Sequence, residues 1–231
     1  GIDKSTIKKA IGTFKGMLVK MRRELMPNHA VITCWDGGKD PQRLALLSDY
    51  KQREQKPSDY YSGIKILQEE MHAAVDMQYL QVQQENVEAD DIIHTLATYY
   101  ALTDCMVTIV SDDKDMLQLL SDQIVVSHSQ KGMLDTLRFK ESFGFMPANI
   151  VDYLALKGDD IDNIPGVAGI GEKTAQKLIQ QFTTIEGLYA NIDVLPAKQK
   201  KTLFDHQKDV LIYKQLITLK TINLDMTKLP D

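Results

Sequence analysis

Carboxylates gather in four short stretches of this 231-residue chain. The acidic residues concerned are Asp36; Glu88, Asp90 and Asp91; Asp112, Asp113 and Asp115; and Asp159, Asp160 and Asp162. Oxygen ligands without cysteine or clustered histidine favour Mg²⁺ or Mn²⁺, with Ca²⁺ as a further candidate. Two such ions ~3.5–4 Å apart can bind both the attacking and the leaving oxygen of a phosphodiester. The stretches therefore predict a site for divalent cations, if the fold brings them together.

The first three stretches each follow a segment that is expected to be a strand. Asp36 closes the run 29–36, Glu88 follows 79–82 after a short loop, and Asp113 follows 106–110. In open sheets of parallel strands, ligands bind outside the carboxyl ends of the strands. These carboxylates are expected to converge at one sheet edge. Asp159 and Asp162 could join them from the later part of the chain.

Each acidic group taken alone has a simpler explanation. Asp and Glu are favoured in the first turn of a helix because they oppose its dipole, and "EADD" at 88–91 or "DDKD" at 112–115 would suit that role. Capping does not explain four groups together, because crowded carboxylates repel and raise each other's pKa unless cations balance them. The combination favours a metal site.

Helical and strand patterns alternate in the first part of the chain. We expect helices at 5–25, 63–75, 88–101 and 113–120, and strands at 29–36, 79–82, 106–110, 124–128 and 133–137. The polar, basic and aromatic stretch 37–61 is long for a connection, which indicates a functional segment. After residue 139 only helical patterns follow, at 148–158, 172–182, 184–192 and 209–219. The sequence predicts an α/β domain with a mostly parallel sheet over 1–145 and a helical region over 146–231.

Composition narrows the class of protein. Hydrophobic residues make up 43% and charged residues 26% of the chain, which is ordinary for a soluble globular protein. No apolar run approaches the ~20 residues of a membrane helix, so no membrane partner is expected. Cys34 and Cys105 are too few for a disulfide framework or a thiolate zinc site and fit a reducing cytoplasm. The net charge of −5 alone argues against a nucleic-acid partner, but acids and bases are bunched along the chain.

A glycine-spaced loop, "GVAGIGEKT" at 166–174, lies between two expected helices. It is not a P-loop, because Glu172 stands before the lysine and no strand precedes the loop. Glycines let the backbone approach a phosphate closely, and N–H groups at the next helix start can donate to it. A plain tight turn between packed helices is an alternative of about equal weight. The candidates for a phosphate contact are Gly166, Gly169, Gly171, Lys173 and Lys177.

Four motifs together resemble the 5′ nucleases, which include the 5′-3′ exonuclease domains of bacterial DNA polymerase I and the flap endonucleases of phages and cells. The motifs are "WDGGKDPQR…DYK", "VEADDII", "VSDDKDMLQLLSD" and "ALKGDDIDNIPGVAGIGEKTAQKLI". The resemblance runs over nearly the whole chain. It implies a PIN-like α/β core with a helix-three-turn-helix DNA-binding region. It also implies metal-dependent hydrolysis of DNA or RNA near a 5′ end, leaving a 5′ phosphate and a 3′ hydroxyl, in replication or repair.

The resemblance implies a setting, partners and ions for this activity. The expected partners are branched or 5′-flap DNA and RNA/DNA, bound by a monomer in the cytoplasm of a bacterial cell or a phage-infected host. The expected cofactors are two Mg²⁺ or Mn²⁺ ions. One group of ligands would comprise Asp36, Glu88, Asp90, Asp91 and Asp113, and the other Asp115, Asp159 and Asp162.

The stretch 37–61 matches the family's helical arch or clamp, through which a single-stranded 5′ flap passes. Arg43 stands seven residues after Asp36 and Lys51 eight residues after Arg43, which is the family's spacing. Both cations would contact the scissile phosphate and stabilise charge in the transition state. Without the resemblance, a solvated loop would be the simpler interpretation of Arg43 and Lys51.

The resemblance implies further contacts to DNA. Tyr50 could stack on a base, and Arg53 and Thr174 would contact the DNA. The glycine loop would bind the duplex backbone downstream of the cut. In some family members the carbonyls of the loop that corresponds to 166–171 also hold K⁺.

Two departures from the family's pattern keep an alternative open. The family begins with a strand that ends in a metal-binding Asp; no such strand precedes the first expected helix here, and Asp3 lacks the strand context. The arch motif places an arginine three residues after the lysine, where this chain has Glu54. The alternative is a non-cleaving protein of this family that binds branched DNA. A PIN-type ribonuclease is a third interpretation, which the helical second part argues against.

Overall fold

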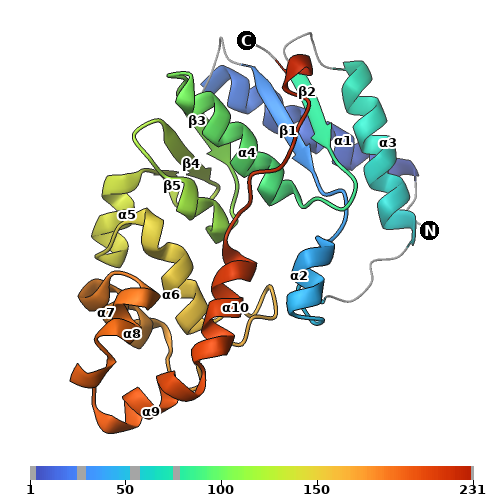
Figure 1. Cartoon of the computed structure of the whole chain (residues 1–231). Helices are drawn as coiled ribbons and strands as arrows, with labels where there is room; N and C mark the ends of the chain where they lie inside the picture. The colour runs from blue at the N-terminus through green and yellow to red at the C-terminus, as the bar shows by residue number, and fades with distance from the viewer. Residues whose placement is uncertain (1–3, 25–29, 53–57, 75–78, 230–231) are drawn as a thin grey trace.

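The computed structural model describes residues 4–24, 30–52, 58–74 and 79–229 (Figure 1). The first part of the chain alternates helices and strands: α1 (Lys4–Glu24), β1 (Val31–Trp35), α2 (Pro41–Leu46), α3 (Ser58–Ala74), β2 (Tyr79–Gln83), α4 (Ala89–Leu102), β3 (Val107–Val110), the 3₁₀ helix η1 (Lys114–Leu119), β4 (Ile124–His128) and β5 (Gly132–Leu134). The second part is helical: α5 (Thr136–Phe143), η2 (Pro147–Asn149), α6 (Ile150–Lys157), α7 (Glu172–Phe182), α8 (Ile185–Ala190), η3 (Ile192–Val194), α9 (Ala197–Asp205), α10 (Gln207–Ile217) and η4 (Met226–Lys228).

The strands in the described ranges form two sheets. β1 pairs in parallel with β2, so that Val31 lies opposite Tyr79, and β3 pairs in parallel with β4. β5 adds to β4 as an antiparallel hairpin strand. α4 packs against both β1 and β3 and so connects the two sheets (Figure 1). The predicted fold class, α/β with mostly parallel strands followed by a helical region, is confirmed.

Several elements differ from the sequence-based expectation. The helix expected at 113–120 is the 3₁₀ helix η1, and the strand expected at 133–137 ends at Leu134 because α5 begins at Thr136. The Asp135 side chain accepts a hydrogen bond from the N–H of Arg138 and caps α5, which ends at Gly144 in a left-handed conformation. Within 37–61, Asp40 caps the short helix α2, which has Pro41 at its first position. Helix α9 also was not predicted.

A single hydrophobic core crosses the expected boundary at residue 145. It contains Ile109 and Val126 from the β3–β4 pair together with Leu154, Ile179 and Ile217 from the helical part. A smaller cluster, with Leu18 and Met71 at its centre, lies between α1 and α3. The helical region is therefore packed directly against the sheet that carries β3, which fixes the distance between the carboxyl end of that strand and the glycine loop.

The segment that follows α10 returns to the first part of the chain. In Figure 1 it leaves the upper end of α10, passes along α4 and ends near β2. None of the described helices is long and apolar enough to cross a membrane.

Candidate metal centre and nucleic-acid interface

Three buried carboxylates lie together beyond the end of β3. Asp115, Asp159 and Asp162 are 5%, 4% and 5% exposed, and one oxygen from each lies within 4.8 Å of the others. Among the described residues no group donates a hydrogen bond to Asp115 Oδ1, although this atom is buried. A buried, unpartnered carboxylate oxygen is costly unless a cation binds it. The three side chains, called here the carboxylate triad, therefore suit a hard divalent cation.

Local backbone geometry turns the triad inward. The N–H of Asp115 donates to Asp113 Oδ1 at 2.9 Å, which starts η1 and buries the Asp115 side chain beside Met116. Asp159 and Ile164 exchange two backbone hydrogen bonds of 2.7 and 2.8 Å and close a turn that carries Asp162. In this turn a Cβ on Gly166 would lie 2.4 Å from the backbone nitrogen of Gly158, and Gly166 has φ +67°. Glycine is required there because the two backbone segments touch.

Two lysines supply positive charge beside the triad. Lys114 Nζ lies 2.6 Å from Asp159 Oδ1. Lys51 Nζ lies 2.7 Å from Glu88 Oε2, 3.1 Å from Asp90 Oδ2 and 3.8 Å from Asp162 Oδ2. These ammonium groups offset part of the carboxylate repulsion where divalent cations could bind.

The backbone at Lys51 is held in an unusual conformation. Its φ is +48°, and its N–H donates to the carbonyl of Asp162 at 3.0 Å. The Asn163 side chain donates to the carbonyls of Asp49 and Gln52. A positive φ at a lysine is costly and persists only when the surroundings determine it, so the turn at 159–164 contributes to the position from which the Lys51 side chain emerges.

Burial and neighbouring charges raise the pKa values of two acidic groups at the site. Burial, together with the charges of Asp113 and Asp162, raises the pKa of Asp115 to about 8. Burial also raises the pKa of Asp90, with contributions from Asp113 and Asp36 that the Lys51 ammonium partly offsets. For Lys51, burial acts to lower the pKa, but Asp90 and the neighbouring carboxylates raise it further. Lys51 therefore stays charged.

In EDTA, the melting temperature is expected to fall as the pH rises from 5 to 8, and Asp115→Asn should remove part of that fall. The folded-state pKa of about 8 lies above the unfolded value of ~3.9. The folded state thus binds an extra proton between these values, and the free energy of unfolding decreases as the pH climbs through that window. Asp115→Asn should raise this free energy by on the order of 2 kcal/mol at pH 8 and by less at pH 5.

Thermal melts of the wild type and the variant at both pH values check this prediction. The control is Asp160→Asn, which changes an exposed carboxylate next to the triad. A stabilisation by Asp115→Asn of the same size at pH 5 and pH 8 would contradict the raised pKa.

The other expected group of metal ligands ranges from exposed to buried side chains. Asp36 is exposed, and its Oδ1 accepts the N–H of Ala89 at the start of α4 at 2.9 Å. Asp113 is also exposed, whereas Asp90 is half-buried. The charges of Asp113 and Asp36 both raise the pKa of Asp90. Glu88 is 3% exposed and faces Lys51. These four carboxylates lie close after the strand ends, and two of them, Glu88 and Asp90, contact Lys51. Within the described ranges they do not form a second compact cluster like the triad.

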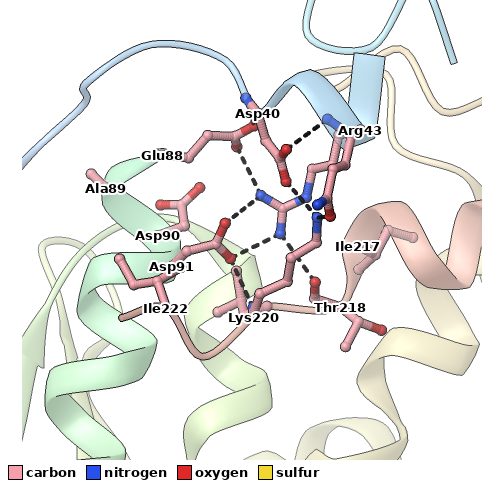
Figure 2. A network of polar contacts seen from close by, with 12 residues as sticks. Asp40, Arg43, Glu88, Ala89, Asp90, Asp91, Ile217, Thr218, Lys220 and Ile222 are labelled. Atoms are coloured by element: carbon pink, nitrogen blue, oxygen red, sulfur yellow. Dashed lines mark hydrogen bonds and ion pairs between the residues drawn. The ribbon is translucent and has the colours of Figure 1, made fainter. Parts of the chain in front are cut away.

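Arg43 and Asp91 lie elsewhere than the sequence suggests (Figure 2). Arg43 is 1% exposed and binds Asp91 through two hydrogen bonds, of 2.7 and 2.9 Å. Its Nη2 also donates to the carbonyl of Thr218 at 3.1 Å. Both oxygens of Asp91 are engaged in this network, since Lys220 N–H donates to Oδ1 at 2.8 Å. Asp91 therefore pairs with Arg43 outside the triad, and Arg43 is not open to a phosphate in this arrangement.

Tyr50 is likewise buried rather than presented to a base. It is 2% exposed, belongs to the hydrophobic core and donates from its hydroxyl to Glu88 Oε2 at 3.3 Å. Burial raises the pKa of that hydroxyl. A ring in this position has no open face for stacking. Arg53, another expected DNA contact, lies outside the described residues.

The glycine loop leads directly into the exposed start of α7. Gly169 and Gly171 are exposed, and Gly169 has φ +79° with open space where a Cβ would stand. Lys173 and Lys177 are exposed one turn apart, while Thr174 is half-buried. This face offers backbone N–H groups and two cations, as a phosphate contact requires.

Two family models together match almost the whole chain. The 5′-3′ exonuclease, N-terminal resolvase-like domain matches residues 3–144, and the 5′-3′ exonuclease, C-terminal SAM fold matches residues 145–229. The chain belongs to the 5′-3′ exonuclease family. A relative named 5′-3′ exonuclease from Bacillus subtilis (strain 168) is 35% identical over 212 residues, which cover 89% of this chain and 70% of the relative.

Members of this 5′-3′ exonuclease family also occur as parts of larger proteins. DNA polymerase I of Bacillus caldotenax is 37% identical over 225 residues, which cover 94% of this chain but 25% of the relative. The chain thus spans about a quarter of the length of that polymerase. The fold resembles that of the bacteriophage T5 flap endonuclease, solved as a pseudo-enzyme-product complex with DNA and metal ions, with a TM-score of 0.74 and 19% identity over 91% of this chain and 80% of that chain.

Three polar residues of this chain were not predicted from the sequence. Lys114 pairs with the triad, and its place inside "DDKD" was the available signal. Asp40 and Lys220 contact each other across the network in Figure 2, although 180 positions separate them. No local pattern could have joined those two residues.

Proposed function

We propose that this chain is a structure-specific 5′ nuclease that hydrolyses phosphodiesters of DNA, or of RNA/DNA, near 5′ ends. The observation that carries the proposal is the buried carboxylate triad, with its unpartnered Asp115 oxygen, beside two lysine ammonium groups. Buried oxygens of a structural ion-pair cluster are normally hydrogen-bonded, whereas Asp115 Oδ1 has no such partner in the part of the chain that the structure describes.

Two divalent cations, Mg²⁺ or Mn²⁺, are proposed as the cofactors. Asp115, Asp159 and Asp162 would hold one, and the carboxylates that follow the strand ends, Asp36, Glu88, Asp90 and Asp113, would hold the other. Such cations, when bound, supply Lewis-acid chemistry to the phosphodiester and make water more acidic. The bacteriophage T5 flap endonuclease, which has a similar fold, was solved with DNA and metal ions, and this supports the use of metal ions here.

Lys51 is proposed as the catalytic cation of the chain itself. Its ammonium faces Glu88, Asp90 and Asp162, where a scissile phosphate would meet the carboxylates. A cation positioned there stabilises the charge that develops on the phosphoryl oxygens in the transition state. Once divalent cations neutralise the carboxylates, Lys51 would be released to donate to the phosphate.

The glycine loop and the start of α7 are proposed to hold the duplex. Their contacts would go to backbone phosphates, which position the DNA without reading sequence. The carbonyls of 166–171 are candidates for a K⁺ site on the same loop. The single-stranded 5′ flap would pass through the stretch 37–61 together with α2 and α3. The chain would act as a monomer.

A fluorescent 5′-flap substrate tests the proposed function directly. We expect a product with Mg²⁺ or Mn²⁺ and none with EDTA, with blunt duplex and single strand of the same sequence cut more slowly. Product ends carrying a 5′ phosphate and a 3′ hydroxyl would fit hydrolysis by the proposed route. Tight flap binding without any metal-dependent product would instead favour a non-cleaving branched-DNA-binding protein.

A further inference from the structure

The segment just after α10 lies against the first part of the chain as a short strap. We call Thr218–Ile222 the C-terminal strap. Its backbone N–H groups donate to side chains of α4: Lys220 to Asp91 at 2.8 Å and Ile222 to Thr95 at 3.0 Å. The neighbouring N–H of Leu219 donates to Gln118 of η1 at 3.0 Å. The strap is thus fixed to α4, which carries Asp90, and to η1, which carries Asp115.

The side chain of Lys220 reaches from the strap to the start of α2. Its Nζ contacts Asp40 Oδ2 (Figure 2). The same atom lies 3.2 Å from Gln42 Oε1. Asp40 is the residue that caps α2, and it accepts the N–H of Gln42 at 2.7 Å. The Thr218 carbonyl accepts from Arg43 on the same helix. The Lys220 side chain and the Thr218 carbonyl thus both join the strap to α2 and its capping residue.

Arg43 depends on these neighbours for its placement. Its guanidinium is 1% exposed, and among the described residues its Nε has no hydrogen-bond partner. The remaining contacts are to Asp91, to Glu88 at 3.5 Å and to the strap carbonyl. A buried guanidinium with an unsatisfied nitrogen is costly to hold, so loss of the strap contacts should let Arg43 and α2 shift.

The position of α2 is transmitted to Lys51 through a short run of backbone hydrogen bonds. The N–H of Leu47 donates to the carbonyl of Arg43, and the N–H of Tyr50 donates to the carbonyl of Leu47, both at 3.0 Å. Lys51 follows immediately. Displacement of α2 would therefore move the ammonium that lies 2.7 Å from Glu88.

We propose that Lys220 is a positioning residue for phosphodiester cleavage: by binding Asp40 and Gln42 it holds α2 and Arg43 so that Lys51 faces the carboxylates. The inference rests on the proposed nuclease function for its kinetic consequence. Its structural part, that Lys220 immobilises α2, stands independently of cleavage.

The test compares Lys220→Met, which keeps the chain length and removes the charge, with Lys220→Arg, which keeps the charge. The matched control is Lys140→Met, at an exposed lysine of α5. Hydrogen exchange of the α2 amides, such as those of Leu44 and Leu47, should be ~10-fold faster in Lys220→Met. Exchange in α7 should be unchanged in every variant, and Lys220→Arg should restore slow exchange in α2.

Single-turnover cleavage of saturating 5′-flap DNA provides the second readout. Lys220→Met should be ~10-fold slower than the wild type, with the dissociation constant for the flap DNA in EDTA changed by less than ~2-fold. Combining Lys220→Met with Asp40→Asn should slow cleavage no further than the slower single variant, because both act through one contact.

If the α2 amides of Lys220→Met exchanged at the same rate as those of the wild type, the inference would be overturned, whether or not the wild type cuts DNA. A loss confined to DNA affinity would also overturn it, since a positioning role acts on the rate of the bound complex. A wild type that does not cleave would reject the proposed function instead, and the exchange data would still decide the role of Lys220.

Discussion

Replacing Asp115 and Asp159 together by asparagine is expected to lower the single-turnover rate of 5′-flap cleavage by ~10³-fold or more. Both carboxylates belong to the buried triad, and the amides of Asn would bind a divalent cation far less strongly than two charged groups. The affinity for flap DNA measured in EDTA should stay within ~2-fold of the wild type or rise slightly, because negative charge beside the phosphates has been removed.

Asp160→Asn is the matched control for this double variant. It changes a carboxylate in the same turn, but that side chain is exposed and lies outside the triad. Its cleavage rate should equal that of the wild type. Near-normal cleavage by the Asp115/Asp159 double variant would reject the triad as the metal site.

Lys51→Ala is expected to reduce the single-turnover rate by ~10²-fold, the effect of removing one preorganised donor from a transition state. The side chain lies between Glu88, Asp90 and Asp162, and no other described ammonium contacts the first two. Lys51→Arg should recover only part of the rate, because the guanidinium is larger and planar and cannot occupy the same point.

The measurement is cleavage at saturating enzyme, with DNA affinity determined separately in EDTA. Affinity should change by less than ~3-fold, since the duplex contacts proposed for α7 are retained. Lys140→Ala, at an exposed lysine of α5, is the control. A fall in affinity with an unchanged rate for the bound complex would make Lys51 a binding residue instead.

The carboxylates that follow the strand ends could be predicted from the sequence because the position of each depends on a local pattern. Asp113 and Asp115 follow an apolar run that forms β3, and the parallel pairing of β3 with β4 places that end at the sheet edge. Asp159 and Asp162 stand in a short glycine-bounded turn after α6. The strand ends were enough to expect Asp113 and Asp115 at this edge, whereas the resemblance to the 5′ nucleases supplied the grouping of Asp115 with Asp159 and Asp162.

The positions of the cationic and aromatic residues could not be predicted in the same way. Arg43 has the sequence spacing of a phosphate ligand, but its environment is decided by Asp91 and by Thr218, which is 175 positions away. Tyr50 lies in a polar stretch that indicated exposure, yet the helical part of the chain covers it in one continuous core. Tertiary contacts of this kind override a local pattern.

Short helices were missed for a related reason. α2 has six residues, too few for an apolar period to be recognised. Its capping residue, Asp40, and the following Pro41 were the available signals. That helix matters because it connects the strap to Lys51.

The most direct test of the metal centre is anomalous diffraction from crystals of the protein soaked in Mn²⁺ at a concentration that supports cleavage. The account predicts an anomalous peak bound by Asp115, Asp159 and Asp162, with Lys114 displaced from Asp159, and no such peak for the Asp115/Asp159 double asparagine variant. A wild-type crystal with Lys114 still on Asp159 and the peak elsewhere, or with no peak at all, would contradict it.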